Sequence, residues 1–522
     1  FGTRSLYDKH TRQSAAKQQT QWPLFTPRIR SLIALRLTLY IDGAFTEGHS
    51  RQVMSTVNPA TGEEWATFAC AAPQDVDRVI GAARRVLDDP TWRDMTQTQR
   101  GKLLYRLGDL IQENAADLGR LETTDSGKLL AETASQTGYV GDYYRYYAGL
   151  ADKIEGAVLP IDKLDMHVFT RREPIGVVVA IVPWNAQMFL TATKLGPALA
   201  AGCSVVLKAS EIAPIPMLEF ARLVEQAGFP PGVVSVITGD AKNCAIPLTR
   251  HADVDRIAFT GGPETARHVV RNSAENFAVT SLELGGKSPI VVFDDADLDG
   301  AANGLIAGNF GASGQSCVAG SRGLIHRPIL EDLIARISEI CANIVVGDPL
   351  EAGTHLGPLC TKAQIDLIVA TLAKAKEQGA KIRFGGAPLD QVGNFMAPTL
   401  VQCDSHDIET LNIELFGPIM SLIPFDTEEE AIALANSTTF GLGSGVFTQN
   451  LARAHRVSAR LKAGICWVNT YRAVSPIAPF GGYNHSGYGR EAGLDAINDY
   501  TRTKTTWINT SDEPMANPFV MR

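Results

Sequence analysis

The chain has 522 residues, more than a single hydrophobic core usually organises, so we expect two or three domains. Hydrophobic residues make up 45% of the chain and charged residues 20%, as in an ordinary globular protein. The formal net charge of −8 argues against nucleic acid or an anionic membrane as the main partner. No stretch reaches the roughly 18 consecutive apolar residues of a membrane span.

The first 36 residues differ in composition from the rest. They carry seven Lys or Arg and a single acid, Asp8. A basic, acid-poor segment of this kind is typical of a targeting peptide, but a mis-assigned start or non-native residues would give the same pattern. We expect residues 1–36 to be disordered or non-native, and the first folded strand to begin at residue 37, in LTLYIDGAF.

Short apolar strands alternate with helices from residue 175 onward. The predicted strands lie in IGVVVAIVPWN, CSVVLKAS, GVVSVITG, DRIAFTGG and AVTSLELGG, with helices such as FLTATKLGPALAAG between them. This alternation indicates βαβ units around a parallel sheet. Such sheets bind nucleotides beyond the carboxyl ends of their strands, so PWN, KASE, TGG and ELGG are the candidate contacts.

A second alternating block begins at SPIVVFDDADL. It continues through RGLIHRP, helices near 330–343 and 360–378, and strands in IMSLIPF, SGVFTQN and GICWVNT. We therefore expect a second α/β domain, with an active site between the two. The predicted division is a nucleotide-binding domain at 37–155 and 174–284, a catalytic domain at 285–485, and a bridging element at 156–173 and 498–510, made of an extended hairpin and a strand.

Eight cysteines are scattered along the chain. None forms a CxxC pair or lies beside a histidine at ligand spacing, so we expect no metal site. Free thiols in a chain of this length favour a reducing, cytoplasmic location. Cys203 and Cys466 lie in apolar strand-like runs and are interpreted as small buried hydrophobic residues. Cys317, in GASGQSCVAGSR, has only small neighbours, so it is the candidate nucleophile.

Cys317 needs a base and an oxyanion donor, and two residues could supply them. A free thiol has a pKa of ~8.5 and is mostly protonated at neutral pH. Glu283, in SLELGGKSP, follows a strand and precedes two glycines whose flexibility could let its carboxylate swing toward a thiol or a water. Asn185, in PWNAQ, offers a side-chain amide suited to an oxyanion. Taken singly, such residues more often cap helices and turns.

Ten motifs occur together in one order: YYRYYAGLADKIEG, VPWN, GPALAAGCSVVLKASE, FTGG, LELGGKSP, GQSCVAGSR, VGDPL, GPL, ELFGP and PFGGYNHSGYGREAG. From about residue 38 to about residue 507, the chain resembles the NAD(P)-dependent aldehyde dehydrogenase superfamily. The resemblance implies two doubly wound α/β domains, a Rossmann-like cofactor domain and a catalytic domain, with a small β element that joins subunits into homodimers or homotetramers.

The resemblance also implies a role for each catalytic candidate. Cys317 would add to the aldehyde to form a thiohemiacetal, while Asn185 and the backbone amide of Cys317 form the oxyanion hole. Hydride would pass to the nicotinamide and leave a thioester, which a water activated by Glu283 would hydrolyse. Adding sulfur first is chemically useful because it creates an alkoxide that can expel hydride.

On the cofactor side, the resemblance favours NAD over NADP. Lys208 and Glu211 match the pair at the adenosine ribose, and a carboxylate there would accept from a free 2′-OH and repel a 2′-phosphate. Gly262 and Ala266 depart from the hydroxyl residue and glycine usual after FTG, which puts the affinity for phosphate in doubt. The full set of predicted cofactor contacts is Val182, Pro183, Trp184, Lys208, Ala209, Ser210, Glu211, Gly261, Gly262, Leu284, Glu414 and Phe416.

The substrate pocket is expected near 143–147 and 187–190, at Ser316 and Val318, and in the loop 469–476 (NTYRAVSP). Arg472 in this loop could hold a substrate carboxylate. A solvated charge or an intersubunit contact is an equally good interpretation. GQSCVAGSR and NTYRAVSP are similar to segments of bacterial enzymes of aromatic and heterocycle breakdown.

Two other functions stay open at this point. The first is a coenzyme A-acylating aldehyde dehydrogenase, against which Glu283 argues because a water-activating carboxylate is useful only when water is the acceptor. The second is a non-catalytic binding or structural protein with the same fold, against which the joint presence of Cys317, Glu283 and Asn185 argues.

Overall fold

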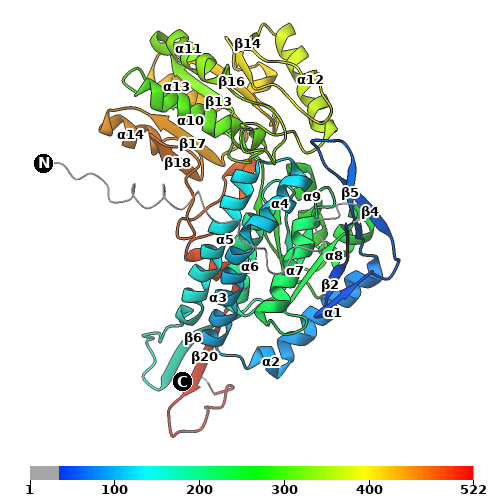
Figure 1. Cartoon of the computed structure of the whole chain (residues 1–522). Coiled ribbons are helices and arrows are strands. Elements are labelled where there is room, and N and C mark those ends of the chain that lie inside the picture. The colour runs from blue at the N-terminus through cyan, green and yellow to red at the C-terminus, as the bar shows by residue number, and fades with distance from the viewer. Residues whose placement is uncertain (1–34, 521–522) are drawn as a thin grey trace, which may run out of the picture.

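The computed structural model describes residues 35–520, and two large sheets organise it (Figure 1). The first sheet has eight strands, and its centre is parallel. Its spatial order is β19 (Gly487–Tyr488), β11 (Val279–Glu283), β10 (Arg256–Thr260), β7 (Val177–Ile181), β8 (Ser204–Ala209), β9 (Val234–Thr238), β2 (Leu39–Ile41) and β3 (Ala44–Thr46).

The second sheet has seven strands and forms the other α/β unit, at the top of Figure 1. Its order is β14 (Lys381–Phe384), β15 (Thr399–Gln402), β16 (Ile419–Phe425), β13 (Arg322–His326), β12 (Pro289–Val292), β17 (Gly443–Phe447) and β18 (Ile465–Val468). Helices α10 (Leu298–Phe310), α11 (Leu330–Cys341), α12 (Lys362–Glu377), α13 (Glu428–Ala435) and α14 (Leu451–Ser458) accompany it. The predicted fold class is confirmed.

Nine helices within residues 35–520 accompany the first sheet. They are α1 (Pro73–Asp88), α2 (Pro90–Arg93), α3 (Gln97–Glu113), α4 (Ala115–Ser126), α5 (Leu130–Leu150), α6 (Gln187–Ala201), α7 (Ile215–Ala227), α8 (Ile246–Arg250) and α9 (Pro263–Ser273). Local signals set their ends: a capping box of Thr96 and Gln99 starts α3, and the left-handed Gly202 ends α6. Strands β7 to β10 are buried along their whole length, as expected for parallel strands covered on both faces.

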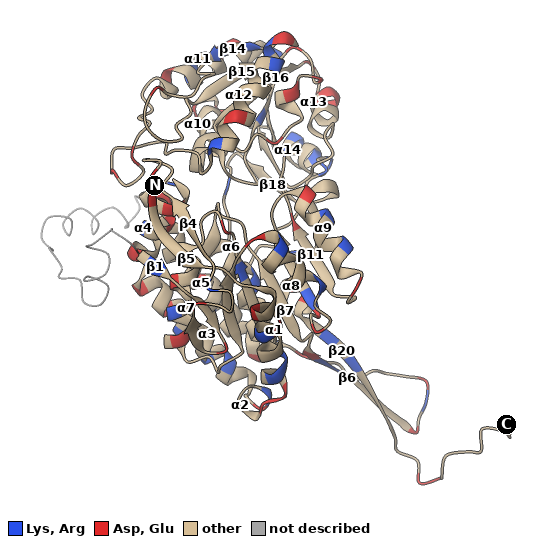
Figure 2. Cartoon of the chain, turned by 90° about the vertical axis from the view of Figure 1, so that its right-hand side faces the viewer, with Lys and Arg blue, Asp and Glu red and all other residues tan. Residues whose placement is uncertain are grey.

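A two-stranded arm projects from the body (Figure 2). Strands β6 (Met166–Pro174) and β20 (Thr501–Asn509) pair antiparallel over nine residues. Within the predicted hairpin at 156–173, the chain before β6 folds back on it through the antiparallel bridge between Val158 and Phe169 and the bond from Leu159 N to Val168 O, but only β6 is a full strand, and its main partner is β20. The predicted strand at 498 begins at Thr501, since residues 495–500 form a 3-10 turn.

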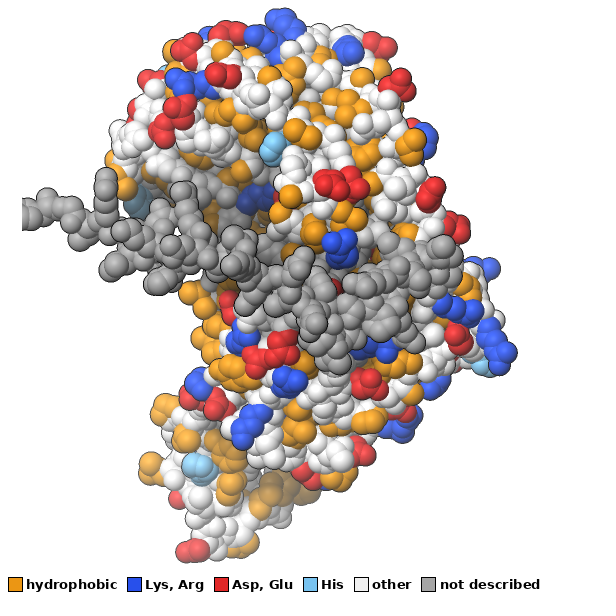
Figure 3. Space-filling view, in the orientation of Figure 1, with side chains coloured by type: hydrophobic (Ala, Val, Ile, Leu, Met, Phe, Trp, Pro, Cys, Tyr) orange, Lys and Arg blue, Asp and Glu red, His pale blue; other side chains and the backbone are white. Residues whose placement is uncertain are grey.

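The amino-terminal boundary also differs slightly from the prediction. Residues 1–34 of the basic leader lie outside the described residues, but Leu35 and Arg36 belong to β1 (Leu35–Leu37). This strand joins β5 (Glu64–Ala69) and β4 (Val53–Val57) in a three-stranded sheet, so the fold begins two residues earlier than expected. None of the helices within 35–520 combines the length and apolar character that a bilayer crossing requires. Acidic and basic side chains are interspersed on the face in Figure 3.

Candidate active site

The four predicted motifs lie at one edge of the first sheet. Strands β11, β10, β7 and β8 are parallel neighbours, so their carboxyl ends, which carry ELGG, TGG, PWN and KASE, lie side by side. A cavity of about 240 Å³ opens there. The predicted site residues that line it are Pro183, Trp184, Asn185, Gly261, Gly262, Glu283, Leu284, Cys317, Glu414 and Phe416.

Four further residues line the cavity. Leu190 belongs to the predicted substrate range 187–190, and Thr260 and Gly285 belong to the predicted TGG and ELGG motifs. The fourth, Gln364, was not predicted from the sequence. Gln364 reaches the cavity from α12 in the second unit and donates through Nε2 to the carbonyl of Leu415. It follows no strand and belongs to no recognised motif, so only the fold reveals it. Thr260 and Gly285 were among the candidate contacts as members of TGG and ELGG, although neither was assigned a role of its own.

Cys317 lies half-buried on the cavity wall, after α10 and a short 3-10 turn. Burial raises the pKa of its thiol to about 12, and the carboxylates of Glu414 and Glu283 add to the rise. The backbone N–H groups of Val318 and Cys317 oppose the shift. A nucleophilic role therefore requires a base close by.

The backbone ahead of Cys317 is strained. Ala312, Ser313 and Gly314 all have left-handed φ angles of 53°, 54° and 74°. Gly314 also packs against the carbonyl of Gly417, where a side chain would overlap. The Ser313 hydroxyl donates to Gly357 O over 2.9 Å. Surrounding contacts hold this conformation, as is common for residues at functional sites.

Asn185 and Gln315 connect the two sheets at this point. The side-chain amide of Asn185 donates through Nδ2 to Gln315 O over 3.0 Å, two residues before the cysteine. The side chain of Gln315 accepts in turn from the backbone N–H of Cys360 over 2.9 Å. Asn185 is thereby fixed beside the Cys317 loop with its amide on the cavity wall.

Glu283 is buried, and neither of its carboxylate oxygens has a hydrogen-bond partner. Burial raises its pKa well above the usual range, and the nearby Glu491 raises it further, while Lys194 and Arg490 oppose the shift. Glu491 forms a buried ion pair with Lys194, whose ammonium also donates to Thr260 over 2.6 Å. Such an unpaired, shifted carboxyl in a cavity is typical of a proton-transfer group.

The two glycines after Glu283 serve close packing. Neither has a left-handed φ. A Cβ on Gly286 would lie 2.7 Å from Cys317 O, and one on Gly285 would overlap the carboxylate of Glu414. Glu414 accepts from Gly286 N over 3.0 Å, and burial raises its pKa to about 7. The predicted flexibility at this position thus stays untested, whereas the need for close approach is evident.

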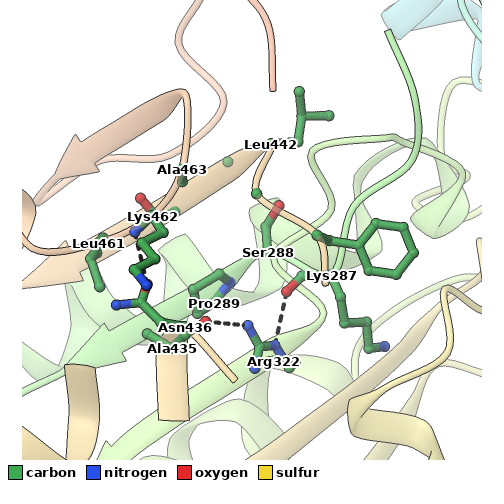
Figure 4. Close-up of a pocket in the computed structure, with 14 residues that line it drawn as sticks. Lys287, Ser288, Pro289, Arg322, Ala435, Asn436, Leu442, Leu461, Lys462 and Ala463 are labelled. Carbon is green, nitrogen blue, oxygen red and sulfur yellow. Dashed lines mark hydrogen bonds between the residues drawn. The ribbon is translucent and has the colours of Figure 1, made fainter. Parts of the chain in front are cut away.

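Arg322 anchors the segments on either side of the site (Figure 4). Its buried guanidinium donates to Lys287 O over 2.8 Å and to Ala435 O over 2.7 Å. The first bond connects the start of β13, which follows the Cys317 loop, to Lys287, the residue directly after Gly285 and Gly286. No carboxylate neutralises this arginine within the described residues, so its role here is to hold backbone carbonyls.

Five predicted cofactor contacts do not line the cavity but lie at the adjacent strand ends. Lys208 donates to Glu211 over 2.6 Å at the end of β8, and Val182 N donates to Lys208 O over 3.2 Å. These five residues are Val182, Lys208, Ala209, Ser210 and Glu211. On the cavity wall itself, the rings of Trp184 and Phe416 meet edge to face at 5.6 Å.

The two departures after FTG have different surroundings. A Cβ on Gly262, the residue before α9, would have no neighbour within 4 Å. Ala266 is buried in the apolar cluster that also contains Phe259 and Val269. Open space for a ligand therefore exists at Gly262, whereas the methyl of Ala266 packs into the core.

A second, smaller cavity of about 40 Å³ lies near the predicted substrate loop. Its wall is mostly aromatic and apolar, with Tyr143, Trp467, Val474 and Phe480. Arg472 does not line this cavity; its Nη1 donates instead to Ala307 O over 3.1 Å. Of the two cysteines interpreted as buried, Cys203 is buried and Cys466 is half-buried. No three potential metal ligands cluster within residues 35–520.

Comparison with known proteins identifies the family. Residues 45–506 match the aldehyde dehydrogenase family. The chain belongs to the aldehyde dehydrogenase family. It is therefore an oxidoreductase of the kind that acts on small-molecule aldehydes. A relative from Acinetobacter baylyi, (Z)-2-((N-methylformamido)methylene)-5-hydroxybutyrolactone dehydrogenase, is 54% identical over 93% of this chain and 99% of its own.

Solved aldehyde dehydrogenases have the same fold. The NAD+ complex of the Bacillus cereus enzyme superposes with a TM-score of 0.91 at 37% identity, covering 93% of this chain and 99% of that one. Betaine aldehyde dehydrogenase from Staphylococcus aureus, also in complex with NAD+, gives 0.91 at 35% identity over 93% and 97%.

Proposed function

We propose that this aldehyde dehydrogenase converts an aldehyde to its carboxylic acid with reduction of NAD, using Cys317 as the nucleophile. The single observation that carries the proposal is the cavity on which Cys317, Glu283 and Asn185 meet with Glu414 and Phe416. The overall balance is aldehyde, NAD+ and water to acid, NADH and a proton.

The first step would be addition of the Cys317 sulfur to the aldehyde carbon. Because burial keeps the thiol protonated, Glu283 would take its proton. The Asn185 amide and the backbone N–H of Cys317 would then stabilise the alkoxide of the thiohemiacetal. Asn185 suits this role since its bond to Gln315 O fixes its orientation.

The cavity and the adjacent ends of β7 and β8 together carry the residues that would hold a dinucleotide, which when bound would supply the hydride acceptor. The carboxylate of Glu414 sits where Gly285 leaves room for it and would hold the nicotinamide ribose. Gly262 leaves open space at the N-terminus of the 11-residue α9, where phosphate would be favoured. Glu211, held by Lys208, would accept from a ribose 2′-OH and repel a 2′-phosphate, which favours NAD over NADP.

Hydrolysis of the Cys317 thioester would complete the cycle. Glu283 would first release the proton of the thiol to solvent, and would then take a proton from water as the water attacks the thioester carbon. Passing that proton to the departing Cys317 sulfur releases the acid and restores the thiol. The lack of hydrogen-bond partners on both Glu283 oxygens leaves them available for this water. Water as acceptor makes coenzyme A unnecessary.

For the substrate, we infer an oxo acid or its cyclic form. The Acinetobacter relative is named for a 5-hydroxybutyrolactone. A 5-hydroxylactone is the ring-closed tautomer of an open-chain aldehyde that carries a carboxyl group. An identity of 54% over nearly the full length supports a substrate of the same class for this chain.

We also infer that the chain self-associates through its arm. Trp507 is 56% exposed on β20, and Ile508 and Val158 are exposed beside it. An exposed strand edge with apolar side chains favours pairing with another chain. Sedimentation should give a dimer or tetramer, and a monomer at micromolar concentration would contradict this.

The test is NADH absorbance with a panel of aldehydes, run with NAD and NADP in parallel and without coenzyme A. The panel pairs 4-oxobutanoate with butanal. We expect acid formation with NAD and its loss in Cys317→Ala by a factor of about a thousand or more. In Glu283→Gln we expect a first-turnover burst that keeps its amplitude but forms more slowly, because the thiol has lost its base, followed by slow steady-state turnover. Undiminished NADH production by Cys317→Ala would overturn the assignment. Cys466→Ser serves as the matched cysteine control.

A further inference from the structure

We propose that Arg472 is a positioning residue for the nucleophile loop, residues 311–321. Its guanidinium fixes the start of this loop from the substrate loop, residues 469–476, and so sets where the Cys317 sulfur lies. The proposal rests on the proposed role of Cys317.

The first observation is the contact with the end of α10. Arg472 Nη1 donates to Ala307 O over 3.1 Å, in the last turn of that helix. A cation next to the unpaired carbonyls of a helix C-terminus is favourable. Gly311 follows directly, and a Cβ at that position would overlap Nη1. Since Gly311 has φ −55°, an alanine would fit its backbone, and the Arg472 guanidinium is the group that would have to move aside for the methyl.

The second observation is that the neighbouring residue holds the other side of Cys317. The Tyr471 hydroxyl donates to Val318 O over 3.0 Å, and its ring is buried. Consecutive residues of the substrate loop therefore contact the nucleophile loop before and after the cysteine. Arg472 itself has a left-handed φ of 64°, a conformation that a non-glycine residue keeps only when its surroundings hold it.

The third observation is that the loop requires support at this point. The residue after Gly311, Ala312, begins the left-handed run, and its N–H donates to Glu132 Oε1 of α5 over 3.0 Å. Arg472 of the substrate loop thus packs against Gly311, and α5 binds the next residue, Ala312, where the strained segment begins. A displacement of about 1 Å at the reacting atom can lower a rate about a hundredfold. Contacts that fix the start of the nucleophile loop would therefore affect kcat.

The same contacts speak against a substrate carboxylate as the partner of Arg472. Trp467 Nε1 donates to Ala473 O over 2.9 Å, which folds the loop back on its own strand. The residues of the substrate loop that line the second cavity are Ala473, Val474 and Ser475, whereas Arg472 donates to α10. A positioning role predicts equal losses for charged and neutral aldehydes, and a binding role predicts a selective loss.

The experiment compares Arg472→Ala and Arg472→Lys with the wild-type enzyme. Initial rates are measured with 4-oxobutanoate and butanal, and the pH dependence of Cys317 alkylation by iodoacetamide is followed by peptide mass spectrometry. We expect kcat to fall about tenfold or more for both aldehydes with KM changed by less than about twofold, partial rescue by lysine, and altered alkylation. Arg327→Ala, which removes an exposed ion pair with Asp426, is the control.

A selective rise in KM for 4-oxobutanoate, or normal kcat and alkylation in a folded Arg472→Ala enzyme, would overturn the proposal. Gly311→Ala gives a second, independent test. Alone it displaces the guanidinium and should lower kcat for both aldehydes, so an unchanged kcat would contradict the proposal even if Arg472→Ala does not fold. Where Arg472→Ala folds, Gly311→Ala should have little further effect in it, and additive losses would contradict the proposal. Cys317→Ser tests the proposed function separately from the role of Arg472. If that variant stays active, Cys317 is not the nucleophile and the proposed function itself fails.

Discussion

The nucleophile loop and the Gly262 turn before α9 border the same cavity but are built in opposite ways. The loop is held at nearly every residue: Ser313 by Gly357, Gln315 by Asn185 and Cys360, and Val318 by Tyr471. The turn at Gly262 has open space within 4 Å. In the proposed mechanism, the backbone is fixed where the Cys317 sulfur would meet the aldehyde carbon, and space is left at Gly262, where a phosphate of the cofactor would bind.

The largest effect that would test this contrast comes from two matched glycine substitutions. Gly286→Ala would place a methyl 2.7 Å from Cys317 O, whereas Gly262→Ala would meet nothing within 4 Å. We expect Gly286→Ala to lower kcat about tenfold to a hundredfold, since the loop must shift, and Gly262→Ala to stay within about twofold. Steady-state rates and thermal unfolding are measured for both variants. Equal effects of Gly286→Ala and Gly262→Ala would contradict the contrast between the nucleophile loop and the Gly262 turn.

Substitutions of the charged residues around Glu283 should have an intermediate effect, a shift of the profile of kcat/KM against pH. Glu491 raises the pKa of Glu283 and Lys194 lowers it. Glu491→Gln removes the negative charge and leaves the Lys194 ammonium, so the pKa of Glu283 falls and its carboxylate forms at lower pH. We expect the rising limb of kcat/KM against pH to move to lower pH in Glu491→Gln and to higher pH in Lys194→Met.

Each of these substitutions breaks a buried ion pair, which destabilises by about 3–5 kcal/mol, so the profiles are recorded below the measured unfolding temperature. Lys362→Met, at an exposed pair with Asp366, is the matched control and should leave the profile in place. Shifts in the same direction for Glu491→Gln and Lys194→Met would rule out an electrostatic origin.

The elements that could be predicted from the sequence were those whose packing produces a recognisable run of apolar residues along the chain. Parallel strands such as β7 are buried on both faces and appear as apolar runs, and their shared direction brought the four motifs to one edge. The edge strand β14, half polar and with an irregular register, gave no such signal. The pairing of β6 with β20 joins residues more than 300 apart, which local pattern does not encode.

The candidate site was predictable in its chemistry but less so in its contacts. Cys317, Glu283 and Asn185 were recognised from residue type and motif, and all three line the cavity. Gln364 was missed because it arrives from a helix of the other unit. Arg472 was noticed for its charge, yet its partner is a helix carbonyl, and which carbonyl an arginine meets depends on the fold.

The smallest expected effect comes from a substitution at Gly262, in the turn with open space. Gly262 precedes α9 without a side-chain cap, and a serine there would add both a cap and a hydroxyl facing open space. We expect Gly262→Ser to lower the KM for NAD about twofold to fivefold, a modest gain because in the proposed binding mode backbone N–H groups would already donate to phosphate there, with kcat unchanged and a slightly higher unfolding temperature. Gly262→Ala supplies the matching methyl without the hydroxyl. If alanine and serine alter the KM for NAD equally, the gain comes from stiffening the turn, and the open space at Gly262 does not mark a phosphate contact.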